Sequence, residues 1–132
     1  MQNVNYPGIR KLLSRYNASG FQVLAFPSNE FGGQAPGSTA CERAYMHTKV
    51  GVPMGAASLT VFDTVEVNGP TAHPLFRFLR STAPRFADCG GCDIAWNYEK
   101  FLLNSHGVPV ARYHAADSPL KAEETIRQLL GM

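Results

Sequence analysis

The sequence predicts an α/β fold in which a central mixed sheet is flanked by helices. Three observations support this class. Apolar residues recur at helical spacing over 7–16, the run FQVLAF at 21–26 has the aromatic and β-branched content of a strand, and two apolar runs at 98–103 and 108–113 flank a polar turn. With 132 residues, of which 45% are hydrophobic, the chain suits a single domain over residues 1–132.

The first half of the chain predicts two helices and two strands. The helix over 7–16 leads into the strand over 21–26, which has no charged residue and is therefore expected to be buried on both faces, as in helix-flanked sheets. A loop rich in Gly and Pro follows. Ser38 is a suitable N-cap for a helix through about Thr48, and residues 59–67 alternate in polarity as a strand does.

The second half predicts a short helix, a hairpin and a final helix. Pro74 favours a first helical position, and Phe78 and Leu79 are expected on the buried face of that helix. The turn at 104–107 contains Asn and Gly, which tolerate positive φ. Ser118, followed by a proline, begins the final helix.

Composition excludes several classes of function. A net charge of +2 is too small for a nucleic-acid-binding surface, and no apolar run approaches the roughly 18 residues of a membrane span. We do not expect the three cysteines, Cys41, Cys89 and Cys92, to form a secreted disulfide framework, because their number is odd and the residues from Met1 onward do not resemble a secretory leader. We expect a reducing, cytoplasmic location, unless a targeting segment preceded the chain.

Two runs carry the functional signal: FQVLAFPSNEFGGQAPGS, which contains Gln34, and DIAWNYEKFLLNSHGVPVARY, which contains Trp96 and Asn97. With VNYPGIRKLLSRYNASGF and VEVNGPTAHPLFRFLRS, these runs resemble the glutathione peroxidases over nearly the whole chain. The resemblance implies that Gln34, Trp96 and Asn97 are the catalytic supporting residues. Their amide and indole N–H groups are suited to holding an anionic nucleophile. It also implies a thioredoxin-like fold without its amino-terminal strands.

The family's nucleophile, a cysteine or selenocysteine, lies in a segment of the type Cys/Sec-Gly-x-Thr-x-x-Asn/Asp-Tyr. Placing Asn5 and Tyr6 on the last two positions puts the nucleophile two residues before Met1. We therefore expect a false start inside a longer selenoprotein, with no peroxidase turnover from the chain as it stands. A truncated chain, a cysteine enzyme with a misplaced start and a degenerate copy are the alternatives.

The resemblance further implies reduction of hydrogen peroxide and organic hydroperoxides in defence against oxidative stress. The reductant would be glutathione or a thioredoxin-type protein, and Lys49 and Arg112 lie at or beside positions where relatives keep basic residues that attract glutathione. A solvated surface charge is an equal alternative for each. No cofactor is expected apart from a selenocysteine in the longer protein, and no metal, nucleic acid or membrane partner. The oligomeric state stays open.

Two other functions remain open from the residues. The chain could be a non-catalytic thioredoxin-like binding module, or a dithiol or metal protein that uses Cys89 and Cys92. The Cys pair precedes a strand rather than opening a helix, unlike redox dithiols whose first Cys has a lowered pKa. It also supplies only half of the four ligands of a structural zinc site.

Overall fold

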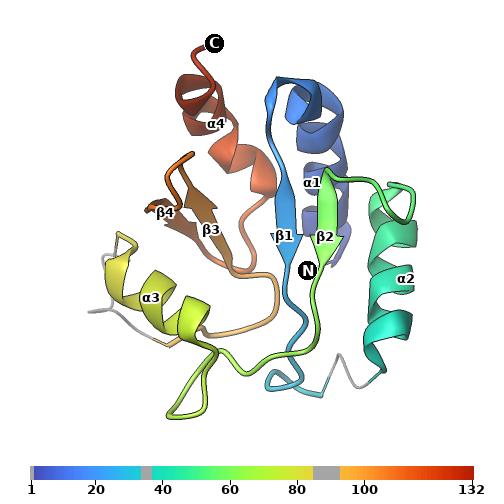
Figure 1. Cartoon of the computed structure of the whole chain (residues 1–132), viewed down its shortest axis with the longest axis vertical. Coiled ribbons are helices and arrows are strands. Elements are labelled where there is room, and N and C mark those ends of the chain that lie inside the picture. The colour runs from blue at the N-terminus through green and yellow to red at the C-terminus, as the bar shows by residue number, and fades with distance from the viewer. Residues whose placement is uncertain (1, 34–36, 85–92) are drawn as a thin grey trace.

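The computed structural model describes residues 2–33, 37–84 and 93–132. It confirms the predicted order of helix, strand, helix, strand, helix, hairpin and helix (Figure 1). The elements are α1 (Gln2–Tyr16), the 3₁₀ turn η1 (Asn17–Ser19), β1 (Val23–Ala25), α2 (Thr39–Val50), β2 (Leu59–Val61), α3 (Pro74–Thr82), β3 (Lys100–Leu103), β4 (Pro109–Tyr113), the 3₁₀ turn η2 (Pro119–Ala122) and α4 (Glu123–Leu129).

The strands form two separate ladders in the described part of the chain, whereas the sequence predicted one central mixed sheet. β1 pairs in parallel with β2, with Val23 opposite Leu59. β3 pairs antiparallel with β4, with Lys100 opposite Tyr113 and a register shift after Leu102. Parallel and antiparallel pairings are therefore both present, but no hydrogen-bonded ladder joins β1 to β3 in the described residues.

A cavity of about 750 Å³ is lined by residues of both β1 and β3. Leu24, the middle residue of β1, lines this cavity and is 52% exposed. The prediction that the strand is buried on both faces is therefore wrong for Leu24. The reason is that the side chain of Leu24 lines the cavity, where no packed element in the described residues covers this face of β1 as helices do in a sheet buried on both faces.

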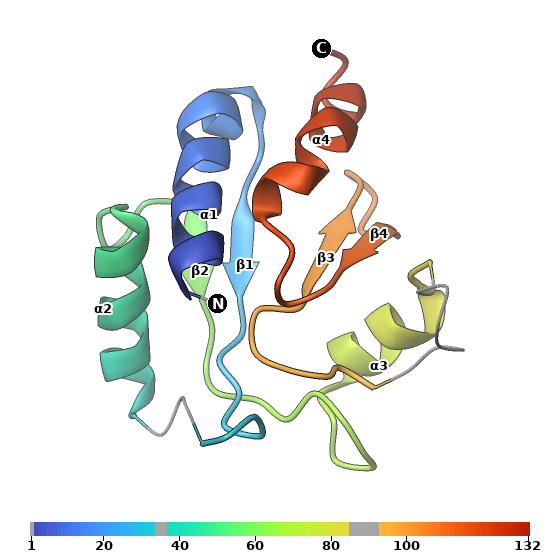
Figure 2. The same ribbon diagram turned by 180° about the vertical axis from the view of Figure 1, so that it is seen from behind.

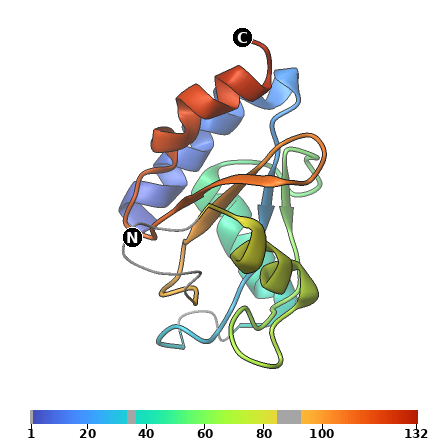
Figure 3. The ribbon, with the colours of Figure 1, turned by 90° about the vertical axis from the view of Figure 1, so that its left-hand side faces the viewer.

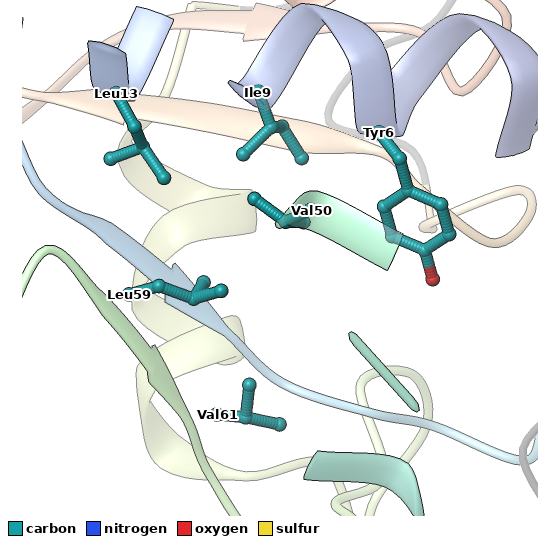
Figure 4. Close-up of a cluster of buried hydrophobic side chains, with 6 residues drawn as sticks. All are labelled: Tyr6, Ile9, Leu13, Val50, Leu59 and Val61. Carbon is teal, nitrogen blue, oxygen red and sulfur yellow. The ribbon is translucent and has the colours of Figure 1, made fainter. Parts of the chain in front are cut away.

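The first helix begins earlier than the sequence predicted, at Gln2 instead of Pro7, so that Pro7 lies inside α1. Proline in a helix removes one backbone hydrogen bond, and tertiary contacts have to offset that loss. Asn5 is fully buried and Tyr6 is a core residue. Figure 4 shows Tyr6 beside Ile9 and Leu13, all pointing from α1 into the cluster that they form with Val50, Leu59 and Val61.

The helices are placed on both sides of the strands. α4 and α1 run side by side (Figure 3), and Leu12 and Tyr16 of α1 pack against Ala122 and Ile126. α2 lies beside α1 (Figure 2), and α3 packs through Phe76 on a cluster that includes side chains near β1 and in β3. No helix in the ranges described here has the length and apolar character needed to cross a membrane.

Helix capping follows the sequence. Ser38 accepts from the backbone N–H of Cys41 at 3.3 Å, and His73 accepts from that of Leu75 at 3.1 Å. Ser118, expected to begin the final helix, accepts from the N–H of Leu120 at 3.2 Å and caps the 3₁₀ turn η2, whereas α4 begins at Glu123 without a side-chain cap. The expected buried face of α3 was partly wrong, because Phe78 is exposed and Phe76 takes the buried position.

Candidate active site

Trp96 and Asn97 lie in the loop that precedes β3 and line the cavity between the ladders. The first turns of α1 line the same cavity through Gln2, Asn5 and Tyr6. The indole of Trp96 is 38% exposed, so a large aromatic side chain remains accessible to solvent. Two neutral side chains with N–H donors thus share one cavity wall with the amino-terminal end of a helix.

Phe31, in the loop that follows β1, holds both of these side chains. The Asn97 amide nitrogen Nδ2 donates a hydrogen bond to the carbonyl oxygen of Phe31 at 3.0 Å. The ring of Phe31 packs against that of Trp96, with 6.1 Å between the ring centroids. The loop after β1, which continues toward Gln34, is therefore fixed to the loop before β3.

The loop before β3 is also fixed by side chains on its other sides. The Asn68 amide pairs with the backbone of Ile94, donating to its carbonyl at 2.7 Å and accepting from its N–H at 2.8 Å. The carboxylate of Glu99 accepts from the N–H of Ala95 at 3.2 Å. These bonds replace the ladder that would hold a regular strand, so Trp96 and Asn97 have defined positions in an irregular segment.

Tyr98 connects this loop to α1. Its φ of 70° is positive, which is uncommon for a residue other than glycine and costs of order 1–3 kcal/mol. Its hydroxyl donates to the hydroxyl of Tyr6 at 3.0 Å, and the two rings meet edge to face. Burial raises the pKa of both hydroxyl groups above the ordinary tyrosine value, so this pair is neutral at physiological pH.

An ion pair is buried directly behind the loop. The guanidinium of Arg112 contacts the Glu99 carboxylate at 2.5 and 2.7 Å, and the two side chains are 1% and 3% exposed. Arg112 also donates to the carbonyl oxygen of Asp93 at 3.3 Å and lies over the ring of Phe101. Removing one partner of such a pair leaves an uncompensated buried charge, so the pair fixes the loop firmly.

Comparison with known proteins decides the family. Residues 1–80 match the sequence profile of the family Glutathione peroxidase. The chain belongs to the glutathione peroxidase family. It is 41% identical to the "Probable phospholipid hydroperoxide glutathione peroxidase" of Helianthus annuus, over 98% of this chain and 68% of that protein.

Other members of the glutathione peroxidase family agree with this assignment. The chain is 40% identical to the "Putative glutathione peroxidase 7, chloroplastic" of Arabidopsis thaliana over 96% of its length, but it spans only 51% of that relative. The crystal structure of T. cruzi GPX1 superposes with a TM-score of 0.69 at 32% identity, covering 96% of this chain and 71% of that one. The expected thioredoxin-like α/β fold is thereby confirmed.

The residues that the glutathione peroxidase resemblance nominated fall in different places. Trp96 and Asn97 lie together, whereas Gln34 lies outside the described residues, as do Cys89 and Cys92. Arg112 was expected either to attract glutathione or to be a solvated surface charge, and the second alternative is wrong, because its side chain is buried and paired with Glu99. Lys49 is exposed at the end of α2, with its ammonium 5.5 Å from the ring centroid of Tyr45.

Several residues of the candidate site were not found from the sequence, namely Phe31, Asn68, Tyr98, Glu99 and Lys100. The one available signal was the charge pattern of Glu99 with Arg112, which lie nearly opposite each other across the predicted hairpin. Among the described residues, no group of three or more His, Cys, Asp or Glu side chains could hold a metal ion, and Cys41 is an exposed free thiol.

Proposed function

We propose that this chain forms the supporting part of a thiol-dependent peroxidase that reduces hydrogen peroxide and organic hydroperoxides. The observation that carries the proposal is the single cavity lined by Trp96, Asn97 and the first turns of α1. A residue joined to the amino end of α1 would enter this cavity. The nucleophile position that the resemblance assigns, shortly before Asn5 and Tyr6, satisfies that condition.

The proposed reaction begins with a thiolate or selenolate at that upstream position. The anion attacks the terminal oxygen of the hydroperoxide, the O–O bond breaks, and the alcohol or water leaves after taking a proton. The nucleophile becomes a sulfenic or selenenic acid. A first thiol then displaces water to form a mixed disulfide or selenenyl sulfide, and a second thiol releases the nucleophile as a disulfide forms.

In this scheme Gln34, Trp96 and Asn97 act as neutral hydrogen-bond donors. An amide or indole N–H stabilises an anion without titrating, so these donors would stabilise the anionic nucleophile and the negative charge that develops on the departing oxygen before it takes a proton. The bond from Asn97 to Phe31 supports this role, because it fixes the amide plane within the cavity wall before peroxide binds. Glutathione or a thioredoxin-type protein would supply the two thiols.

The decisive experiment restores the upstream segment. Fusing the amino-terminal region of the Helianthus annuus relative to this chain, with cysteine at the nucleophile position, should produce thiol-dependent consumption of peroxide. Trp96→Phe or Gln34→Ala in the fusion should slow the peroxide step about 10- to 1,000-fold, the range for losing one preorganised donor. Exchanging glutathione for thioredoxin identifies the reductant.

Two controls decide between this function and the alternatives. The chain without the fused segment should not turn over peroxide, and changing the introduced cysteine to serine should abolish the activity of the fusion. If the unfused chain is equally active and Cys89→Ser or Cys92→Ser removes that activity, the dithiol function is correct and the proposal is overturned. If the folded fusion is inactive with every reductant, the chain is a binding module.

A further inference from the structure

Lys100, the first residue of β3, extends its ammonium group between three oxygen atoms from three separate segments. Its Nζ donates to the side-chain oxygen Oδ1 of Asn5 at 2.6 Å, to the carbonyl oxygen of Tyr98 at 2.8 Å and to that of Ala115 at 3.3 Å. Asn5 lies in α1, Tyr98 in the loop that carries Trp96 and Asn97, and Ala115 in the connection after β4.

The partner in α1 is itself held rigidly. Asn5 is 0% exposed, and its amide nitrogen donates to the same carbonyl oxygen of Ala115 at 3.0 Å. Lys100 and Asn5 therefore share one acceptor and also bond to each other. Any shift of α1 relative to the loop before β3 would break two or more of these bonds.

We propose that Lys100 is a positioning residue that fixes the loop carrying Trp96 and Asn97 to the first turn of α1. The inference rests on the proposed function in one respect. That function gives a reason for holding α1 and the loop in fixed positions, because the nucleophile would be joined to α1 and the hydrogen-bond donors lie in the loop. Trp96, Asn97, Asn5 and Lys100 all line the same cavity.

The chemistry of the ammonium explains why lysine is needed at this point. An ammonium carries three N–H donors and no acceptor, which matches the three oxygen atoms around it. A neutral amine has only two N–H donors, so one of the three oxygen atoms would lose its donor. Burial lowers the pKa of Lys100 to about 8, so this change falls within an accessible pH range.

Other titratable groups surround Lys100 and have to be controlled. Tyr98, whose carbonyl oxygen accepts from Lys100, and Tyr6 bond to each other through their hydroxyls, and burial raises the pKa of both. Asp117 and Glu99 act on it as negative charges and Lys121 as a positive one. Asp117 is bonded to Lys121 and to the backbone of His114, while Glu99 is paired with Arg112. A Lys100 variant keeps all of these groups, so its pH profile isolates the lysine.

The experiment uses the chain as it stands and the fluorescence of Trp96, its single tryptophan. Iodide quenching and emission wavelength are measured for the wild type, Lys100→Met, Lys100→Arg and the exposed control Lys11→Met, with circular dichroism as a check on folding. We expect Lys100→Met to raise the quenching constant about two-fold, because the indole is 38% exposed at present and release of the loop would expose it fully. Lys11→Met should match the wild type, and Lys100→Arg, which keeps a charged donor, should restore most of the protection.

The pH profile of Trp96 emission gives a second readout, and its wild-type arm tests the proposal without any variant. The wild type should show a change in Trp96 emission with a midpoint near pH 8, and Lys100→Met should not. Wild-type emission that stays constant between about pH 7 and 9, or an identical transition in Lys100→Met, would overturn the proposal. Neither measurement depends on peroxide, so an inactive fusion protein would refute the proposed function without affecting this result.

Discussion

Asn97 and Phe31 are 66 residues apart in the sequence, yet the amide nitrogen of one lies 3.0 Å from the carbonyl oxygen of the other. This bond joins the loop after β1 to the loop before β3. The first loop follows a strand of the β1–β2 ladder, and the second precedes a strand of the β3–β4 ladder. No strand pairing connects these two ladders in the described residues. The relative position of the two halves of the candidate site therefore depends on side-chain contacts.

The first prediction concerns this bond. Asn97→Asp replaces the donating NH₂ with a carboxylate oxygen that faces the Phe31 carbonyl, so we expect the free energy of unfolding to fall by about 1–3 kcal/mol. Urea unfolding followed by circular dichroism measures the change. Asn104→Asp is the matched control, because the Asn104 oxygen only accepts, from His106 and Val108, and the carboxylate keeps both bonds. Equal stability of the two variants would contradict the assigned role of the bond.

The second prediction separates the two cations that were expected to attract glutathione. Arg112→Leu leaves the Glu99 carboxylate buried without its partner and should reduce the free energy of unfolding by about 3–5 kcal/mol. Lys49→Leu, on the surface of α2, should change it by less than about 0.5 kcal/mol. A double variant that also replaces Glu99 with leucine should recover much of the loss. If Arg112→Leu unfolds at the same urea concentration as the wild type, the Arg112 guanidinium is not the internal partner of Glu99.

The third prediction concerns association. Leu24 is an exposed aliphatic side chain on β1, and β1 has a hydrogen-bonded neighbour only on the β2 side in the part of the chain described here. Unpaired strand edges promote edge-to-edge association, and lysine on such an edge opposes it. We expect Leu24→Lys to lower the associated fraction in sedimentation velocity at a given concentration.

Val108→Lys is the control for that experiment. Val108 is also an exposed aliphatic residue, but it lies in the turn region of the hairpin and does not line the cavity. Its replacement adds the same charge elsewhere. If both lysine variants reduce association equally, net charge explains the effect and the edge of β1 does not.

The fourth prediction is the pH dependence of stability that Lys100 causes. Its folded pKa of about 8 lies below the ordinary value of 10.5, so between these values the unfolded chain binds the proton and the folded chain does not. Stability therefore rises with pH across this window relative to Lys100→Met, because the cost of burying the charge disappears. Urea unfolding of both proteins at about pH 7 and 9.5 tests the sign.

If the free energies of unfolding of the wild type and Lys100→Met differ by the same amount at both pH values, the prediction is contradicted. Measurement stays below about pH 10, where tyrosines of the unfolded chain begin to ionise. Loss of the Lys100 proton affects the free energy of unfolding and the position of Trp96 in different ways. The free energy of unfolding includes the cost of burying a charge, whereas the fluorescence reports only how the loop is held.

Local signals in the sequence predicted the elements well. Ser38 caps α2 as expected, Ser118 caps the 3₁₀ turn that leads into α4, and Gly107 in the hairpin turn has the positive φ, 79°, that such a turn requires. Each of these depends on neighbours within a few residues. Trp96 and Asn97 were found in another way, through a resemblance to a family, because an aromatic and an amide carry no local signal for catalysis.

The features that the sequence did not predict have a common physical cause, which is contact between segments far apart in the chain. The start of α1 before Pro7 depends on the burial of Asn5 and Tyr6 against other elements, and the exposure of Leu24 depends on what lies beside β1. The pairing of Asn68 with Ile94 was not predicted, because it spans 26 positions. Side-chain periodicity reports one face of one element and contains no information about such pairs.

α1 contributes to two separate hydrophobic clusters, with Ile9 and Leu13 in the one around β2 and Leu12 and Tyr16 in the one around α4. Unwinding this helix would expose both clusters at once. The protein should therefore open cooperatively, and backbone amides in β1 and β4 should exchange with deuterium at rates set by the same opening event as those in the middle of α1. The opening rate of this helix would then limit exchange in both ladders, although no strand pairing joins them in the described residues.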